Sequence, residues 1–162
     1  MKRTIVTGAN KGIGLAIVKR LLAEYPDSFV YLGSRDVQRG EEAIKQIESE
    51  MGATAKGRVK LLELDVTSDI SVQKAAEAVK AELSEANDQL YGLVNNAGGG
   101  GPHHRKVLEL NTYGVCRTTE AFLPMIKSSG LYLTHRNFQL ILKYLKRGRT
   151  KKETYYLNHT FF

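Results

Sequence analysis

The chain of 162 residues has a single cysteine, Cys116. It also has no uninterrupted apolar run of roughly 18 residues, the length that would suggest a transmembrane helix. A lone cysteine excludes a disulfide within the chain, and no apolar signal segment precedes the first predicted strand. These absences predict a cytoplasmic protein, in a compartment where thiols stay reduced.

Acidic residues are almost missing from the last part of the chain. Residues 130–162 hold seven Lys and Arg, one acid and seven of the thirteen aromatic residues. Residues 1–129 are nearly balanced, with 17 Lys and Arg against 16 Asp and Glu. We therefore expect one globular domain over residues 1–129, followed by a basic, aromatic-rich tail over residues 130–162.

Within the predicted domain, short β-rich runs alternate with helical patterns. This alternation predicts parallel strands joined by right-handed crossovers, and hence an α/β fold with a doubly wound parallel sheet of the Rossmann type. The four strands are expected at residues 3–7, 29–32, 59–64 and 90–94.

The three predicted helices have recognisable starts and apolar faces. The first follows a glycine-rich turn and has Ile13, Ile17 and Leu21 on one face. Asp36 is expected to cap the second helix, and Ser68 or Asp69 the third. The inward face predicted for the third helix consists of Val72, Ala75, Ala76, Val79 and Leu83.

The turn after the first strand indicates a function. Its glycines, Gly8, Gly12 and Gly14, would let the backbone turn tightly and approach a pyrophosphate. The helix that follows would offer free N–H groups and a positive dipole end. A glycine-containing strand–helix turn is also an ordinary connection, so this interpretation needs support from other segments.

Polar residues follow the other three strands and supply that support. Arg35 comes after the second strand, Asp65 after the third, and Asn95 with Asn96 after the fourth. Ligands of open α/β sheets bind beyond the carboxyl ends of the strands. We therefore expect these residues and the glycine turn to surround one dinucleotide site.

Together these motifs resemble the short-chain dehydrogenase/reductase family, and the resemblance covers about residues 1–129. It rests on Thr7-Gly8-x3-Gly12-x-Gly14, Asp65-Val66, Asn95-Asn96-Ala97-Gly98 and Asn111-x2-Gly114. The turn Gly33-Ser34-Arg35-Asp36 and the whole run from Thr7 to Gly14 are most similar to NADPH-dependent carbonyl reductases. The resemblance implies such an enzyme truncated after its nucleotide-binding half, with a carbonyl substrate only if activity survives.

Arg35 favours NADP(H) over NAD(H) as the cofactor. It lies 21 residues after Gly14, close to the spacing of about 20 at which the ribose-reading residue follows the glycine motif. A guanidinium can bind two oxygens of a 2′-phosphate, whereas an acid would repel it. Lys11 could add a second positive charge. The alternative is that Arg35 is a solvated surface charge.

The resemblance implies further cofactor contacts. Asp65 would accept a hydrogen bond from adenine, with Val66 alongside, and Asn95 and the Ala97-Gly98 backbone would flank the ribose. Asp65 as a helix cap and Asn95 as a sheet-stabilising residue remain alternatives. The predicted cofactor-binding set is Gly8, Asn10, Lys11, Gly12, Ile13, Gly14, Arg35, Asp65, Val66, Asn95, Ala97 and Gly98.

The catalytic residues that the resemblance implies are largely missing. Family members reduce carbonyls with a serine, a tyrosine and a lysine four residues after it, assisted by an asparagine. None of the eight tyrosines has lysine at this spacing, although Tyr113 has Arg117 there, and the segment 131–137 lacks the serine. Asn111 alone matches a catalytic position, so we expect little or no reductase activity from this chain.

Two further departures concern the structure. Only twelve residues separate Gly98 from Asn111, fewer than the family places there, so most of the helix before Asn111 is expected to be lost. His103 and His104 in this segment are interpreted as a loop pair and not as a metal site. Later strands are expected to be missing, which would leave the fourth strand as an unpaired apolar edge for an oligomer or a partner to cover.

The tail allows two interpretations. A helical stripe that begins at Phe138 and a basic run at 147–152 could bind nucleic acid or an anionic membrane, without predicting a specific nucleic acid. The compositional break near Gly130 favours a segment foreign to the family, as an altered splice, a frameshift or a wrong gene model would give. Two functions are alternatives to an inactive carbonyl reductase. One is a non-catalytic NADP(H)- or partner-binding protein, and the other is a protein whose tail binds nucleic acid or an anionic membrane.

Overall fold

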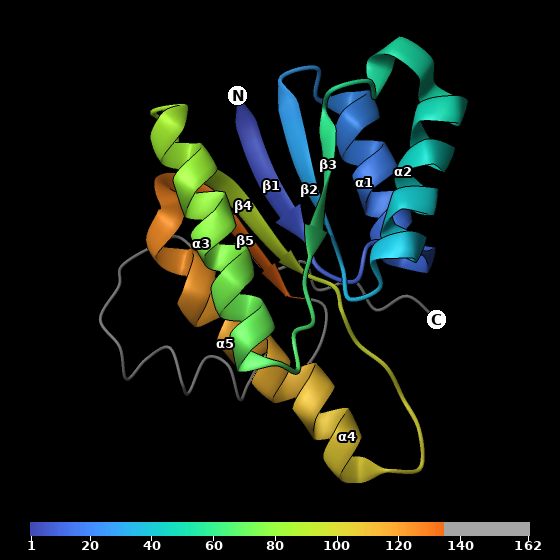
Figure 1. The fold of residues 1–162 in the computed structure, drawn as a ribbon, viewed down its shortest axis with the longest axis vertical. Helices are drawn as coiled ribbons and strands as arrows, with labels where there is room; N and C mark the ends of the chain where they lie inside the picture. The colour runs from blue at the N-terminus through green and yellow to red at the C-terminus, as the bar shows by residue number, and fades with distance from the viewer. Residues whose placement is uncertain (135–162) are drawn as a thin grey trace.

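The computed structural model describes residues 1–134 and contains a five-stranded sheet in the order β3-β2-β1-β4-β5 (Figure 1). All four neighbouring pairs within this sheet are parallel. The chain winds outward from β1 to β3 and then returns to the other side of β1, which is the doubly wound arrangement. The predicted α/β fold class is confirmed.

The elements up to β4 follow the predicted order, with differences of a few residues at their ends. The strands are β1 Lys2–Val6, β2 Ser28–Ser34, β3 Val59–Glu63, β4 Leu90–Asn95 and β5 Ile126–Thr134. The α-helices are α1 Gly12–Glu24, α2 Val37–Met51, α3 Asp69–Glu85, α4 His104–Leu108 and α5 Gly114–Phe122. Short turns are η1 Gly52–Thr54, the π-helical η2 Glu109–Tyr113, and η3 Leu123–Met125.

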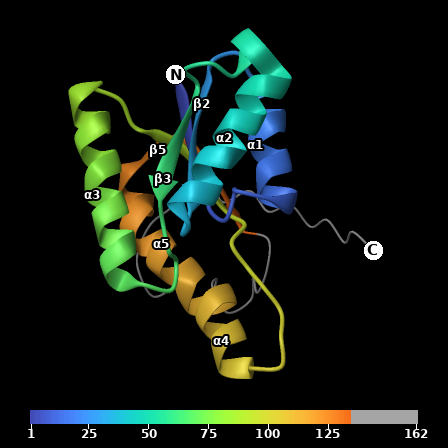
Figure 2. The same ribbon diagram turned by 45° about the vertical axis from the view of Figure 1, so that its right-hand side comes forward.

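Helices cover both faces of the sheet, so the fold has three layers and two apolar cores (Figures 1 and 2). α1 and α2 lie on one face, where Val18 and Ile47 are fully buried. α3 and α5 lie on the other face, where Val79 and Phe122 are fully buried. The inner strands are covered on both sides, which explains their continuous apolar sequences.

The starts of α2 and α3 and the inner face of α3 are as predicted. The Ser68 side chain caps α3 by accepting a hydrogen bond from the N–H of Ser71. Asp36 caps α2 by accepting from the N–H of Arg39 at 3.0 Å. All five residues expected on the inner face of α3 are buried. Capping and periodicity therefore account for these two helices.

The predicted apolar face of α1 is confirmed in part, because Ile17 and Leu21 are partly buried and pack against the core, but Ile13 does not belong to this face. Ile13 is 60% exposed, and the residues that α1 buries are Gly14, Val18 and Leu22. A Cβ atom on Gly14 would lie 2.6 Å from the carbonyl oxygen of Gly8, so the helix touches the preceding turn here. This contact sets the rotation of α1 about its axis, and hydrophobic spacing does not register it.

The prediction that the fourth strand would be an unpaired edge is wrong. β5 pairs in parallel with β4, with Leu90 opposite Ile126 and Asn95 opposite Thr134, and β5 forms the outer edge instead. Strand pairing needs only backbone N–H and C=O groups. A segment of foreign composition can therefore continue the sheet, and the boundary after residue 129 lies inside β5.

β5 is irregular between Ile126 and Leu131, where its register with β4 shifts. Ser128 and Ser129, predicted to lie in a turn before the strand, lie in this irregular part. A Cβ atom on Gly130 would come within 2.7 Å of a carbonyl oxygen of β4. Glycine therefore lets the bulged segment close against its neighbour.

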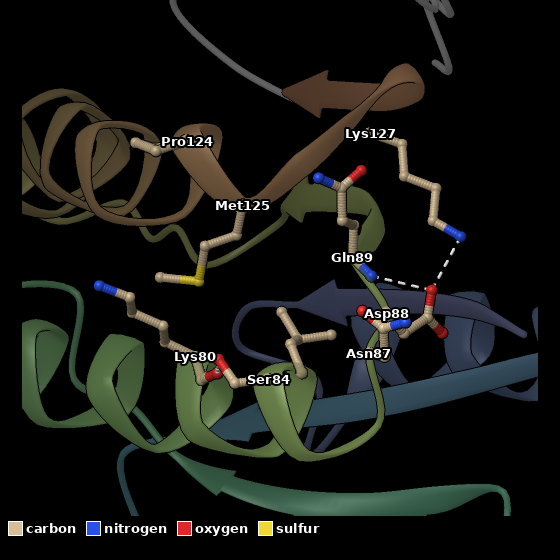
Figure 3. A pocket seen from close by; sticks show the side chains of 9 residues that line it. Lys80, Ser84, Asn87, Asp88, Gln89, Pro124, Met125 and Lys127 are labelled. Carbon is tan, nitrogen blue, oxygen red and sulfur yellow. Dashed lines mark hydrogen bonds and ion pairs between the residues drawn. The ribbon is translucent and has the colours of Figure 1, made fainter.

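A cluster of charges anchors β5 at the amino end of the sheet (Figure 3). Asp88, just before β4, forms an ion pair with Lys127 at 2.8 Å, and Arg3 of β1 lies 3.4 Å from the same carboxylate. The hydrogen bond from Lys127 lowers the pKa of Asp88 to about 2. The carboxylate thus stays charged at neutral pH and links the central strand to the edge strand.

A pocket of about 640 Å³ lies beside this cluster, between the end of α3 and the start of β5 (Figure 3). Lys80 and Ser84 line it from α3, and Pro124 and Met125 line it from η3. None of the predicted cofactor residues is among its lining residues. The pocket lies at the amino end of the sheet and is separate from the predicted dinucleotide site.

Some predictions concern residues beyond those described. The helical stripe that begins at Phe138 and the basic run at 147–152 lie after residue 134. Of the helices within residues 1–134, none combines the length and the apolar character needed to cross a membrane.

The Asp88 cluster makes a testable contribution to stability. Its folded pKa of about 2 lies below the unfolded value of about 3.9. The charge therefore stabilises the fold fully above a pH of about 4, and this stabilisation is lost as the pH falls through about 2. At neutral pH, Asp88→Asn should lower the free energy of unfolding by roughly 1–2 kcal/mol, measured by urea titration.

The pH dependence identifies the carboxylate as the cause. The stability difference between the wild type and Asp88→Asn should shrink as the pH falls from about 4 to about 2. Asp27→Asn, which removes a more exposed ion pair with Lys2, is the control and should cost less. A difference that stays constant over this pH range would contradict the role given to Asp88.

Candidate dinucleotide site

Backbone hydrogen bonds join the carboxyl ends of four strands into one edge. The N–H of Thr7, after β1, donates to Val94 of β4 at 3.0 Å. The N–H of Ala9 donates to Gly33 of β2 at 2.8 Å, and the N–H of Leu64, after β3, donates to the last residue of β2 at 2.9 Å. The segments predicted to bind the cofactor therefore meet at this edge.

Thr7 and Asn96 form a clamp between the glycine turn and the end of β4. The Thr7 hydroxyl accepts hydrogen bonds from the N–H groups of Asn96 at 3.0 Å and Ala97 at 2.9 Å. In return, the Asn96 amide donates to the carbonyl oxygens of Thr7 at 2.9 Å and Gly8 at 3.1 Å. Thr7 is 1% exposed, so these bonds are shielded from water and fix the shape of the turn.

The three glycines of the turn have different roles. Gly8 has a φ of +62°, and a Cβ atom there would lie 2.8 Å from the Cα atom of Ala97. Gly14 makes the close contact with Gly8 that was described above for α1. Gly12 has a φ of +59°, but a Cβ atom there would meet no other atom within 4 Å. Gly8 and Gly14 thus serve internal packing, whereas Gly12 borders open space at the start of the helix.

The first turn of α1 presents backbone N–H groups without partners. Lys11 occupies the N-cap position with an extended backbone, and no side chain caps the helix. Within residues 1–134, the N–H groups of Gly12, Ile13 and Gly14 donate no hydrogen bond. The half-buried Asn10 precedes them in the turn. Free donors at the positive end of a long helix, beside open space, suit the pyrophosphate of a dinucleotide.

Arg35 and Lys11 are exposed, and neither forms an ion pair with another residue of the described part of the chain. Asp36, the acid beside Arg35, caps α2 and pairs with Arg39 at 3.4 Å. Arg35 follows the end of β2, which is bonded to the glycine turn. Its guanidinium is therefore available to a ligand at this edge, and its contact with a 2′-phosphate stays a prediction.

Asp65 closes a turn before α3 and does not cap the helix. Its Oδ1 accepts from the N–H of Thr67 at 2.9 Å and from the Thr67 hydroxyl at 2.7 Å, while Ser68 is the cap. Within residues 1–134, Oδ2 of Asp65 accepts no hydrogen bond. Val66 is 5% exposed and packs against Gly114 of α5. One carboxylate oxygen thus remains for a ligand.

Asn95 is 3% exposed and its side chain lies against α5. Its Oδ1 accepts from the Thr118 hydroxyl at 2.7 Å, and its Nδ2 donates to the Thr119 hydroxyl at 3.4 Å. These bonds favour the alternative in which Asn95 stabilises the fold, here by linking the end of β4 to α5. The ribose contact predicted for Asn95 stays a prediction.

Asn111 binds the loop that follows β4. Its Oδ1 accepts from the N–H of Gly99 at 2.9 Å, and its Nδ2 donates to the Gly99 carbonyl at 2.8 Å. A Cβ atom on Gly98 would lie 3.0 Å from Oδ1 of Asn111. Asn111 is 5% exposed and lies in the π-helical turn η2. π turns are often found at functional sites, and here the turn aims the Asn111 amide at the loop.

The helix before Asn111 is short, as the sequence spacing predicts. α4 begins at His104, with His103 at its N-cap position, and it continues through η2 into α5. Figure 1 shows this rod extending past the carboxyl ends of the strands. Within residues 1–134, no three His, Cys, Asp or Glu side chains are grouped in a way that could hold a metal ion.

Tyr113 is followed four positions later by a cation, Arg117 of α5. Tyr113 is poorly placed for catalysis. Tyr113 is 56% exposed on the helix, while Arg117 pairs with Glu109 and Asp69. An arginine held by two carboxylates cannot also assist a tyrosine hydroxyl. Within residues 1–134, Tyr113 and Arg117 therefore do not act as a tyrosine–cation pair.

Sequence reasoning missed the residues that hold the site together. Thr7 and Asn96 belong to the motifs used for the resemblance, but their mutual bonds join positions 89 residues apart. Thr118 and Arg117 lie outside those motifs. Their polar side chains on the inner side of an amphipathic helix are the signal that could have identified them.

The family model for short chain dehydrogenases matches residues 2–131 of this chain. A mitochondrial D-beta-hydroxybutyrate dehydrogenase of Bos taurus is 30% identical over 135 residues, covering 78% of this chain and 38% of that protein. An alcohol dehydrogenase of the archaeon Thermococcus sibiricus, complexed with 5-hydroxy-NADP, has a TM-score of 0.66 and 31% identity. An NADPH-bound carbonyl reductase from chicken fatty liver has a TM-score of 0.69 and 28% identity.

The similarity covers most of this chain but only part of its relatives. It spans 83% of this chain and 57% of the archaeal enzyme, and 82% of this chain and 58% of the chicken enzyme. The chain thus spans little more than half of these solved structures and 38% of the bovine protein.

The clamp can be tested without a ligand. Thr7→Val keeps the shape of the side chain but removes the acceptor of the Ala97 N–H and one of the two acceptors of the Asn96 N–H, so it should lower the free energy of unfolding by about 1–2 kcal/mol. Thr4→Val, in the preceding strand β1, is the matched control, because the hydroxyl of the buried Thr4 forms no side-chain hydrogen bond within residues 1–134. Equal urea midpoints for the two variants would show that the clamp contributes nothing.

Proposed function

The chain belongs to the short-chain dehydrogenase/reductase family, and we propose that it binds NADP(H) at the carboxyl edge of its sheet with little or no reductase activity of its own. By ancestry the site is that of an NADPH-dependent carbonyl oxidoreductase. The chain spans only part of its relatives, so a carbonyl substrate is a proposal for the activity of a complete site.

The start of α1 is the observation that carries this proposal. The N–H groups of Gly12, Ile13 and Gly14 donate no hydrogen bond within residues 1–134, and Gly12 borders open space at the positive end of the helix. The exposed Arg35 follows the strand to which the turn is bonded. The N–H groups would bind the pyrophosphate, and the guanidinium would bind the 2′-phosphate that distinguishes NADP(H) from NAD(H).

The other residues of the edge fit the rest of the nucleotide. The unused Oδ2 of Asp65 would accept from the adenine amino group, and Lys11 would add positive charge near the phosphates. The backbone of Ala97 and Gly98 would lie along the ribose. The clamp fixes Ala97 on one side, and Asn111 binds the N–H of Gly99 on the other. When bound, NADPH would supply a hydride for a carbonyl.

The comparisons support the choice of cofactor. The archaeal alcohol dehydrogenase was solved with 5-hydroxy-NADP and the chicken carbonyl reductase with NADPH. Both structures share the fold of this chain at identities above a quarter. The exposed Arg35, with its neighbouring acid Asp36 engaged in capping α2, agrees with an NADP(H) site.

The lack of activity follows from the missing proton donor. A tyrosine with an ordinary pKa of about 10 transfers its proton poorly at neutral pH unless a nearby cation lowers its pKa. The chain has no tyrosine with lysine four residues later. Asn111 remains, but its side chain is engaged with Gly99. The chain alone is therefore proposed to hold the nucleotide without turning it over.

A fluorescence titration with NADPH tests the binding site. Arg35→Glu should raise the Kd for NADPH on the order of 10- to 100-fold, because a bidentate bond to phosphate is replaced by repulsion. The Kd for NADH should stay equal or fall. Lys45→Glu, an exposed charge reversal on α2, is the matched control and should leave both values unchanged. Equal losses in both variants would contradict a specific phosphate contact.

Steady-state assays test the predicted inactivity. The purified chain should not increase the rate at which NADPH is oxidised by a quinone or an aromatic aldehyde, because it lacks a suitable proton donor. The absorbance of NADPH measures this rate, and an active carbonyl reductase serves as the positive control. Turnover that disappears in Asn111→Ala would refute the prediction.

A further inference from the structure

Within the rod, η2 and α5 touch two loops of the proposed cofactor site, the loop after β4 and the loop after β3. At one point, Asn111 binds the backbone of Gly99 in the loop after β4. One turn later, Gly114 packs on Val66 in the loop after β3, where a Cβ atom would lie 2.8 Å from Cγ2 of Val66. Figure 2 shows α5 running beside α3 and below the sheet. The rod therefore spans the adenine end and the nicotinamide end of the edge.

Arg117 lies one turn beyond Gly114 and joins three segments. Its Nε binds the carboxylate of Asp69, the first residue of α3. Its Nη2 lies 2.6 Å from Oε1 of Glu109, the first residue of the π turn. Its Nη1 donates to the backbone carbonyl of Val66 at 3.4 Å. A single planar guanidinium thus connects the loop after β3, the start of α3 and the π turn.

We infer that Arg117 is a positioning residue of the cofactor site, which fixes the Asp65–Val66 loop and the π turn of Asn111 in one arrangement without touching the cofactor. This inference rests on the proposed function. A displaced Val66 carbonyl would carry the free oxygen of Asp65 away from adenine. A displaced π turn would release the Asn111 amide from the loop after β4.

The burial of the partners argues for positioning more than for stability. The Asp69 side chain is 82% exposed and that of Glu109 is 38% exposed, whereas that of Arg117 is 23% exposed. Exposed ion pairs contribute little to global stability. The planar guanidinium nevertheless holds three partners in fixed directions, which a lysine ammonium cannot reproduce.

The test compares Arg117→Met and Arg117→Lys with the wild-type chain. Lys60→Met is the matched control, because it removes another ion pair to α3, with Glu82 at 2.6 Å. Amide hydrogen exchange is read at Ser68, whose N–H donates to Asp65, and at Gly99, whose N–H donates to Asn111. The affinity for NADPH is measured on the same proteins.

Arg117→Met should lower the exchange protection of both amides by roughly tenfold and weaken NADPH binding on the order of 3- to 30-fold. Arg117→Lys should recover part of both effects. Lys60→Met should change neither, whatever it does to the melting temperature.

Unchanged protection, or a loss at Ser68 without a loss at Gly99, would overturn the inference, because Arg117 would then act on one segment alone. Unchanged NADPH affinity in a variant with both losses would also overturn it. If the wild type binds no NADPH, the proposed function fails. The exchange data then still decide whether Arg117 couples the two loops.

Discussion

The clamp between Thr7 and Asn96 is the constraint on which the rest of the site depends. A parallel sheet fixes the strands, but the turns at its carboxyl edge must find partners of their own for their polar groups. Here one hydroxyl and one amide supply four bonds between the segments that follow β1 and β4. The clamp fixes the glycine turn, and the first three N–H groups of α1 donate no hydrogen bond within residues 1–134. These donors are free because the first N–H groups of a helix have no acceptor within the helix and no side chain caps α1.

The proposal that this chain binds a nucleotide without catalysis rests on the same edge. The groups proposed to bind the nucleotide come from segments that follow β1 to β4, and each segment is fixed by contacts within residues 1–134. The proton donor of a carbonyl reductase would have to come from another part of a chain. Asn95 is buried against α5, and the Asn111 amide is bonded to Gly99. These polar side chains near the edge thus stabilise the edge itself.

The parts of the fold that depend on neighbouring residues were predictable from the sequence. The caps Asp36 and Ser68 and the inner face of α3 follow from local hydrogen bonding and a regular period. The rotation of α1 was not predictable in this way, because it depends on Gly14 touching Gly8 and not on the apolar residues. The site residues named from motifs meet at one edge, but the bonds that bring them there join distant positions. No local pattern encodes those bonds.

β5 shows why composition is a poor guide to where a sheet ends. Residues after 129 differ in charge and aromatic content from those before, yet the strand crosses this boundary and its residues 131–134 pair with β4. Composition reports side chains, whereas the ladder is made of backbone groups that every residue except proline supplies. Before the boundary, side chains also hold the strand, since Lys127 is anchored on Asp88 and Ile126 is buried in the core. Residues before the boundary therefore position a strand whose second half lies beyond it.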